Sequence, residues 1–384
     1  MSARVNVMHV VQGMGRGGAE SVVLELVRAA SPEVRMLVCA LNEGGASLEA
    51  ARAAGAKTWV LAKGGRTAEG VVRLARLMRE ERVDVVHGHN PTGALYGTFA
   101  AWWAGVPVRV RTEHTLRYRG RHSAVYPLLE HALNRLNQRV LCVSEAVRRS
   151  HLAVAPARRL VVVENGIGEA PAPRPRDTVR ADVGEDQGAL VALAVGGLTR
   201  QKAHEVLIAA LARTLPALPQ ARLWLAGDGP RRGELETIAR EAGIAHAVRF
   251  LGSPPHVPDL LSAADLFVLS SRREGLSISL LEAMRAGRAA LVTDVGGNPD
   301  VVRHGETGWV VPPEDAAALG QGLERLLGDS ALRARMGEAS LQRWRERFTA
   351  RRMAEQTERV YREALAERGR RAAAREETSG RVVA

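Results

Sequence analysis

Aromatic side chains and cysteines are scarce in this chain of 384 residues. Phe, Trp and Tyr make up 4% of it, too few to supply the stacking platforms on which single-stranded nucleic acid binds. The two cysteines, Cys39 and Cys142, both lie in apolar, strand-like runs. They therefore indicate buried thiols in a reducing compartment and argue against a disulfide framework.

Long hydrophobic runs are also missing. The apolar run before the first glycines is too short for a signal peptide, so we expect the protein to stay in the cytoplasm. The longest charge-free stretch, residues 90–108, contains two prolines and three glycines. It predicts a buried helix followed by a turn and not a transmembrane span.

Positive charge, by contrast, is abundant. The formal net charge is +12. Such a balance favours anionic partners, which include phosphorylated ligands, a membrane surface and nucleic acid, and it does not choose among them.

Apolar strand-like runs alternate with helical patterns along most of the chain. The runs are almost continuously apolar, which is typical of parallel strands covered by helices on both faces. A segment rich in proline, glycine and charge interrupts the alternation once. We therefore predict an α/β protein of two Rossmann-like doubly wound domains facing each other across a cleft. The predicted parts are an N-terminal domain over 1–170, a linker over 171–188, a C-terminal domain over 189–350, a helix over 351–366 that crosses back to the N-terminal domain, and a disordered basic tail over 367–384.

A glycine-rich turn lies near the start of the chain. Gly13, Gly15 and Gly18 form the pattern G-x-G-x-x-G between an apolar run and an amphipathic one. Small residues before a helix let backbone N–H groups approach a phosphate. The motif alone fits a dinucleotide fingerprint with Glu43 on the ribose, a loop for another phosphate ligand, or a tight turn without a ligand.

Two carboxylates stand near the end of a strand in the second half. Glu274 follows the strand, and Glu282 lies eight residues later in the next helix. At the carboxyl end of a parallel strand a carboxylate can accept hydrogen bonds from sugar hydroxyls, and the helix start offers N–H groups to a phosphate. A solvated Glu274 and an ion-paired Glu282 explain the same pattern without a ligand.

Two further turns favour a ligand. Gly196 ends an earlier strand, and Lys202 precedes the following helix, from where an ammonium group can neutralise a diphosphate. Gly227 and Gly229 end the next strand, where backbone can approach a base or a ribose. Three such turns predict a nucleotide site, and a dinucleotide fingerprint near the N-terminus leaves them unexplained.

From Val5 to about Ala366 the chain resembles the family 4 glycosyltransferases, which are retaining, metal-independent enzymes of the GT-B fold that use a nucleotide-activated sugar. The resemblance rests on EGLSISLLEAMRAG, which matches the family's E-x7-E signature, on DVGGNPDVVRHGETGWVVPP after it, on VGGLTRQKAH, on GMGRGGAESV, and on the H-x-H and T-x-H patterns of residues 83–115. It implies transfer of a sugar to a saccharide or lipid-linked acceptor, in polysaccharide or glycolipid assembly, with no cofactor. No D-x-D occurs in the sequence, so a bridging metal ion is not expected.

The resemblance also implies which residues form the site. Glu274 and His114 would lie at the transferred sugar. Lys202 would neutralise the diphosphate, and Glu282 would bind the donor ribose. The other implied donor contacts are Gly17, Gly18, Gly196, Arg200, Gly227, Gly229, Gly275, Leu276 and Ser277. His89 would lie on the acceptor side, although His87, His89 and His114 are also explained as satisfied polar residues at strand ends.

Two positions depart from the family pattern. Gly197 stands where family members commonly carry an arginine that shares the leaving-group charge with the lysine, and Ala203 stands where glycine is usual. Either Arg200 takes the place of the missing arginine, or activity is weaker. A nucleotide-sugar 2-epimerase and a non-catalytic sugar-nucleotide-binding protein remain as alternatives.

A basic segment precedes an amphipathic pattern in the first half. It holds Arg117, Arg119 and Arg121 beside leucines and tyrosines. Such a segment can rest on an anionic membrane surface and present a lipid-linked acceptor, and it is equally typical of a solvated helix edge. We expect no specific nucleic-acid partner.

Overall fold

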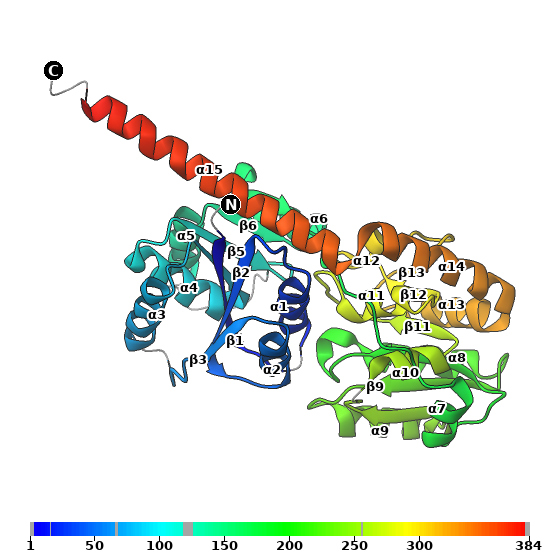
Figure 1. The fold of residues 1–384 in the computed structure, drawn as a ribbon. Helices are drawn as coiled ribbons and strands as arrows, with labels where there is room; N and C mark the ends of the chain where they lie inside the picture. Colours follow the sequence, from blue (N-terminus) through cyan, green and yellow to red (C-terminus); the bar gives the residue numbers. More distant parts are fainter. Residues whose placement is uncertain (1–3, 16, 66–67, 118–125, 255, 381–384) are drawn as a thin grey trace. The chain divides into compact units, whose positions relative to one another are not determined.

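Two compact units make up the chain. The computed structural model describes residues 4–15, 17–65, 68–117, 126–254 and 256–380. The first unit combines Met1–Gly168 with Ala350–Ala384, and the second spans Glu169–Thr349. Figure 1 shows that each unit has its own central sheet with helices packed on it.

The first unit is built on a seven-stranded parallel sheet in the order β3-β2-β1-β4-β5-β6-β7. Its central strands are buried along almost their whole length, as their continuous apolar sequence predicts. The strands are β1 (Val5–Gly13), β2 (Val34–Glu43), β3 (Lys57–Val60), β4 (Val85–His89), β5 (Val108–Glu113), β6 (Arg139–Cys142) and β7 (Leu160–Val162). The helices are α1 (Gly18–Arg28), α2 (Ala46–Ala53), α3 (Ala68–Glu80), α4 (Asn90–Ala104), α5 (Tyr126–Leu136), α6 (Glu145–His151) and α15 (Ala350–Gly380), with a short 3-10 turn η1 (Ala157–Arg159).

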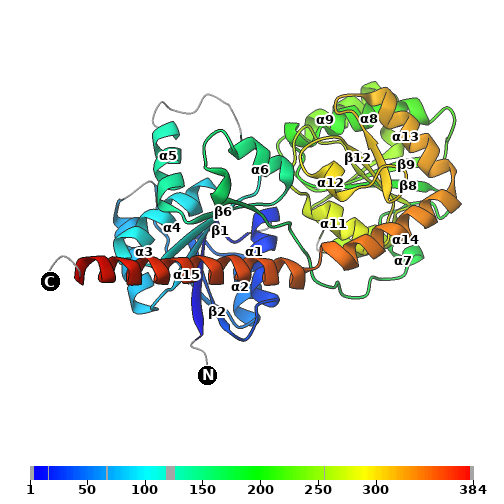
Figure 2. The same cartoon turned by 90° about the horizontal axis from the view of Figure 1, so that it is seen from above.

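The two faces of this sheet differ in character. Val86 of β4 packs in an apolar core with Leu74 of α3 and Ala100 of α4. The next residue, His87, points to the other face because side chains alternate along a strand, and there it meets Tyr361 of α15. Figure 2 shows α15 lying along this unit. Helix α15 thus covers a face of the sheet that carries polar side chains.

The second unit is built on a six-stranded parallel sheet in the order β10-β9-β8-β11-β12-β13. Leucines of α8 and α13, such as Leu211 and Leu323, form its core with the sheet. The strands are β8 (Leu190–Val195), β9 (Ala221–Ala226), β10 (Val248–Gly252), β11 (Leu266–Leu269), β12 (Ala290–Thr293) and β13 (Gly308–Val311). The helices are α7 (Arg176–Asp182), α8 (His204–Thr214), α9 (Arg232–Glu241), α10 (Val257–Ala263), α11 (Ile278–Arg285), α12 (Asn298–Val301), α13 (Ala316–Gly328) and α14 (Ser330–Arg347), with 3-10 turns η2 (Arg200–Lys202) and η3 (Ala245–Ala247).

Both sheets follow the same strand order, which is that of doubly wound nucleotide-binding sheets, with one strand added in the first unit. The predicted fold class of two Rossmann-like domains is therefore confirmed. In such sheets the strand order reverses beside the first strand, and ligands bind at the carboxyl ends of the strands flanking that switch point. These strands are β1 and β4 in the first unit and β8 and β11 in the second.

The segment predicted as a linker, 171–188, is more than a bare connection. It contains α7, whose Arg180 is fully buried. Its guanidinium donates to the carboxylate of Asp265 and to the carbonyl oxygens of Ala263 and Ala189. Composition could not reveal this, because a buried arginine is tolerated only where distant parts of the chain satisfy its hydrogen bonds.

The C-terminal helix is longer than predicted. We expected it to end near Ala366 and the tail after it to be disordered, but α15 continues to Gly380. The tail lacks apolar periodicity, yet alanine, arginine and glutamate are strong helix formers, and they extend a helix that has already formed. The Glu358 carboxylate accepts a hydrogen bond of 2.8 Å from the backbone N–H of Ser31 and so connects α15 to the rest of the first unit.

Within the described residues, no helix is both long and apolar enough to cross a bilayer. The charge-free stretch that could be mistaken for such a span forms α4. This helix ends at Ala104, and its C-cap residue Gly105 has the left-handed φ of 77°.

Candidate functional site

The switch point of the second sheet brings together two residues predicted to bind the donor. The segment after β8 leads through η2 to Lys202, and the loop after β11 carries Glu274. Because β8 and β11 are neighbours in the sheet, the two loops meet although 72 residues separate Lys202 from Glu274.

Lys202 and Glu274 form an ion pair. The Lys202 Nζ lies 2.7 Å from the Glu274 Oε1, and the Ser271 hydroxyl donates to the same oxygen at 2.6 Å. The lysine and glutamate side chains are 18% and 8% exposed, so water hardly screens the pair. A solvated Glu274 is therefore wrong. A pair of this kind can exchange one partner for the phosphate or hydroxyl group of a ligand.

Hydrogen bonds hold the two loops against each other. The Ser270 hydroxyl donates to the carbonyl oxygen of Lys202 at 2.9 Å. The backbone N–H of Arg272 donates to the carbonyl oxygen of Gln201 at 2.8 Å. The Gln201 side chain in turn donates to the Arg273 carbonyl oxygen at 2.9 Å. The charged groups of the site thus stand on a fixed base, as electrostatic stabilisation requires.

Glycine is necessary where other loops pack closely against the two loops that carry Lys202 and Glu274. Gly227 has a φ of 151°, and a Cβ atom there would lie 2.0 Å from the Gly196 carbonyl oxygen. Gly296 has a φ of 55°, and its Cβ atom would lie 1.8 Å from the Glu274 carbonyl oxygen. Since both conformations and both contacts exclude a side chain, these glycines have a packing role whatever the ligand.

Helix α11 begins at the same edge of the sheet. The segment before it, which includes Gly275, Leu276 and Ser277, is buried. Ser277 is the N-cap residue, but its hydroxyl lies 3.1 Å from the Ser279 hydroxyl and caps no backbone N–H group of the helix. N–H groups of the first turn are therefore left without a side-chain cap, which suits an anion. Glu282 lies farther along α11 and is partly buried.

The two departures from the family pattern have different structural consequences. Gly197 is exposed, its φ lies outside the left-handed region, and a Cβ atom there would meet nothing closer than 3.6 Å. Ala203 is left-handed with a φ of 51°, which explains why glycine suits that position. Arg200 is exposed, and its charge helps to lower the pKa of Glu234, after the hydrogen bond and charge of Arg231.

Four histidines gather in the first unit, where His9 lies in the middle of β1, His87 and His89 lie on β4, and His114 follows β5. The Nδ1 of His9 on β1 lies 2.9 Å from the Nε2 of His89 on β4, and the Nδ1 of His89 lies 3.1 Å from the Nε2 of His114 after β5. Burial lowers the pKa of His9 to about 4, and burial lowers that of His114 to about 4 despite the charge of Glu113. Burial also holds the pKa of His87 and His89 well below the usual value, so all four rings are neutral near pH 7.

His87 is held separately from the other three. Its Nδ1 lies 2.5 Å from the Tyr361 hydroxyl and its Nε2 lies 2.6 Å from the Thr112 hydroxyl. His87 is thus a satisfied polar residue of the strand. His89 is fully buried with both nitrogens bonded to histidines, and its expected place on the acceptor side stays a prediction. His114, by contrast, is partly exposed.

The histidine cluster also has a spacing that a metal ion can use. His9, His87 and His89 each offer a nitrogen, and these atoms lie within 4.8 Å of one another. Hydrogen bonds within the protein already occupy both nitrogens of His87 and of His89. A metal ion would have to break such bonds, and we therefore assign the cluster to hydrogen bonding.

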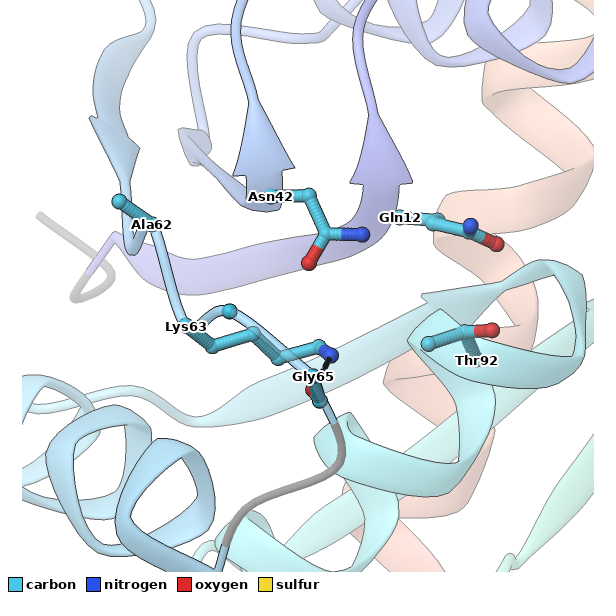
Figure 3. Close-up of a pocket in the computed structure, with 7 residues that line it drawn as sticks. Gln12, Asn42, Ala62, Lys63, Gly65 and Thr92 are labelled. Atoms are coloured by element: carbon cyan, nitrogen blue, oxygen red, sulfur yellow. Dashed lines mark hydrogen bonds between the residues drawn. The ribbon is translucent and has the colours of Figure 1, made fainter.

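A pocket of about 520 Å³ lies at the carboxyl ends of β1 and β2 in the first unit. Figure 3 shows Gln12 and Asn42 at the ends of these strands, Lys63 on the loop after β3, and Thr92 on α4. The Lys63 Nζ donates to a carbonyl oxygen of its own loop and lies 4.6 Å from the centroid of the Tyr96 ring. The amides, the hydroxyl and the Lys63 ammonium group among the described lining residues suit a hydroxylated ligand with a negative group.

Family models match both units. Residues 16–169 match the model described as glycosyltransferase family 4, and residues 175–343 match the model described as glycosyl transferases group 1. An alpha-maltose-1-phosphate synthase of Mycolicibacterium smegmatis is 32% identical over 74% of this chain and 80% of its own length. The chain belongs to the group 1, family 4 glycosyltransferases.

Other relatives of this glycosyltransferase agree. The lipopolysaccharide core biosynthesis glycosyltransferase LpsD of Rhizobium meliloti is 28% identical over 90% of this chain and 94% of its own. A crystal structure of Anabaena HepE in complex with UDP and glucose matches with a TM-score of 0.83 at 20% identity, over 93% of this chain and 99% of its own. The family and the enzyme class predicted from the sequence are confirmed, and the interpretation of the first glycines as a dinucleotide fingerprint is wrong.

Sequence reasoning missed one member of the histidine cluster, His9, and a residue bonded to the cluster, Tyr361. The signal for His9 was a polar residue in the middle of the apolar run VNVMHVV. Tyr361 is 274 residues from His87 along the chain, and no local pattern could connect them.

The remaining predicted residues lie in the first unit. Gly17 is the exposed N-cap of α1 and Gly18 its first residue. The Arg117 guanidinium makes two hydrogen bonds, of 3.1 and 2.9 Å, to the carboxylate of the buried Glu130. This favours a structural role for that arginine. Arg119 and Arg121 lie outside the described residues.

Proposed function

We propose that this glycosyltransferase moves a sugar from a nucleoside diphosphate sugar to a hydroxyl group of its acceptor, with retention of configuration and without a metal ion. The observation that carries the proposal is the Lys202–Glu274 pair at the switch point of the second sheet. An ammonium group stabilises a departing diphosphate, and a carboxylate holds sugar hydroxyls. The UDP and glucose in the related HepE structure support this class of donor.

When the donor binds, its groups replace the contact between Lys202 and Glu274, and each side chain then contacts the donor. The diphosphate approaches Lys202 and the uncapped first turn of α11, and these replace the metal ion that neutralises a leaving group in other enzymes. The sugar hydroxyls donate to Glu274, while the Ser271 hydroxyl keeps that carboxylate in position. Glu282 on α11 accepts hydrogen bonds from the ribose.

We place the acceptor in the first unit, at the pocket lined by Gln12, Asn42, Lys63 and Thr92. The relatives support a saccharide acceptor or one with an anionic group, since one is named for lipopolysaccharide core biosynthesis and another as a maltose-1-phosphate synthase. Assembly of a polysaccharide or glycolipid is the role that follows. His114 lies at the transferred sugar.

The experiment that tests the donor site is a thermal-shift screen with a panel of nucleotide sugars. A ligand at about 100 times its Kd adds about 2.7 kcal/mol to the stability of the folded state, which is a measurable rise in Tm. We expect Glu282→Ala to abolish the rise for the preferred donor, because the ribose loses its partner. Glu338→Ala, at an exposed position of α14 in the same unit, is the matched control and should leave it intact.

Product analysis then decides the reaction. We expect the preferred donor to yield a glycoside when saccharide or lipid-phosphate acceptors are added. Epimer formation without an acceptor would indicate a 2-epimerase, and binding with neither transfer nor hydrolysis would indicate a non-catalytic protein. An unchanged thermal shift in Glu282→Ala contradicts the assigned ribose contact.

A further inference from the structure

Three histidines of the first unit form a hydrogen-bonded chain that leads from the surface to a buried end. His114 is bonded to His89, and His89 to His9, at 3.1 and 2.9 Å. Since its Nε2 is used by His89, the Nδ1 of the partly exposed His114 is the nitrogen that a ligand can reach. At the other end the Nε2 of His9 is buried and, within the described part of the chain, has no hydrogen-bond partner.

Neutral imidazoles allow only two proton arrangements in this chain, because each ring carries one proton and each bond needs one donor. If His114 donates to His89, then His89 must donate to His9, and the proton of His9 remains on its unpartnered Nε2. If His9 donates to His89, then His89 donates to His114, and the proton of His114 remains on Nδ1. Either arrangement determines all three tautomers at once.

The two arrangements differ in what they leave buried at His9, whose side chain is 0% exposed. The first leaves an N–H group without an acceptor, and the second leaves only a lone pair. The rings of His87 and His89 lie with centroids 5.1 and 5.2 Å from that of His9, so packing surrounds the site. Orphaned buried N–H groups are among the rarest features of folded proteins, which favours the second arrangement.

We propose that His9 and His89 are positioning residues that hold His114 in its Nδ1–H tautomer and so make it a fixed hydrogen-bond donor to an oxygen atom of the bound sugar or its phosphate. The inference rests on the proposed function, in which His114 lies at the transferred sugar. A donor held in one tautomer need not reorganise when negative charge develops on the oxygen it faces. His114 does not serve as the general base in this tautomer, because its Nδ1 already carries a proton and its Nε2 accepts the hydrogen bond from His89.

The first test reads the tautomers in the full-length protein without a ligand. Long-range 1H–15N correlation spectra of protein labelled at histidine, recorded near pH 7, distinguish Nδ1–H, Nε2–H and cationic rings, and single variants assign the signals. We expect Nδ1–H at His9, His89 and His114. His87 lies outside this chain, because its two nitrogens bond the Tyr361 and Thr112 hydroxyls, and its signals serve as the internal reference. An Nε2–H or cationic His114 overturns the proposal, whether or not the protein transfers a sugar.

The second test measures the consequence for catalysis. His9→Leu removes the donor to His89, and we expect kcat for sugar transfer to fall about tenfold while the donor KM stays within about twofold. His9→Asn, which offers an amide N–H near the position of Nδ1, should restore most of the loss. His246→Leu is the matched control, since His246 is exposed in the second unit.

The outcomes separate the two proposals. If His9→Leu lowers kcat while His114 keeps its wild-type tautomer, or if His9→Asn restores nothing, the positioning role is wrong. If no variant or wild-type protein transfers a sugar, the proposed function fails, and the spectra still decide the tautomer. Should His9→Leu not fold, the wild-type spectra and His9→Asn decide.

Discussion

Replacing Gly197 with arginine should raise the activity of this glycosyltransferase. Family members commonly carry arginine at this position, beside the lysine that faces the leaving group. The position can accept it, because Gly197 is exposed and a Cβ atom would lie 3.6 Å from both the Asp228 carbonyl oxygen and the Thr199 Cγ2. These are ordinary van der Waals distances, so neither a clash nor backbone strain opposes the substitution.

The expected gain is the difference between two terms. A hydrogen bond to a charged group contributes about 1.5–3 kcal/mol, and ordering an arginine side chain costs up to about 2 kcal/mol. A net gain of about 1 kcal/mol corresponds to a rise of about fivefold in kcat/KM. If the arginine acts on charge that develops as the diphosphate leaves, the rise appears in kcat more than in KM.

Initial rates of transfer at varied donor concentration measure this gain. Gly197→Met is the matched control, because it adds a long side chain without charge and should leave kcat/KM near the wild-type value. Gly196→Arg should instead be harmful, since Gly196 has a φ of 155° and a Cβ atom there would lie 3.1 Å from the Lys202 Cε. If Gly197→Arg melts like the wild type and yet is no faster than Gly197→Met, the reasoning about the missing cation is wrong.

Two further predictions concern the first unit. Lys63→Ala should raise the acceptor KM about tenfold and leave the donor KM unchanged, because the pocket loses the one cation among its described lining residues. Lys63→Arg should retain most of the affinity, and an unaltered acceptor KM in Lys63→Ala would place the acceptor elsewhere. Stability should fall in acid because of Glu113, whose pKa burial by itself would raise, while the charge of Arg111 and the hydrogen bond and charge of His151 lower it to about 2. A carboxyl with a depressed pKa in the folded state contributes stability above its unfolded value of about 4.5, and this contribution, at most about 3 kcal/mol, is lost as the pH falls toward 2. Melting temperatures between about pH 6 and pH 3 should therefore fall less steeply in Glu113→Gln, and equal slopes in the two proteins would contradict the assignment.

The architecture was predictable because parallel strands buried on both faces must be apolar along their length, and that pattern is local. β1, β2 and β4 show it directly. The two errors arose where local composition misleads. By composition, the segment around Arg180 indicated a polar linker, but in the fold Asp265 and distant carbonyl groups accept the hydrogen bonds of this arginine. The charged tail, in turn, extends a helix that tertiary packing stabilises.

The proposed donor site was likewise predictable only in part. The sequence by itself determined that Lys202 and Glu274 follow strands of one sheet, because chain turns at strand ends have a recognisable composition. Their ion pair required β8 to lie beside β11, and strand order depends on packing across the whole unit. Only the tertiary structure could show it.

The histidine chain is the feature that the sequence predicted least. His9, His89 and His114 come from three different strand regions, and nothing in their spacing along the chain sets the two distances that connect them. The sequence determined which chemical groups are present and that each stands at or within an apolar strand. The tertiary structure alone decided that they touch, because the order of the strands and the burial beneath α15 are properties of the folded unit and not of any one segment.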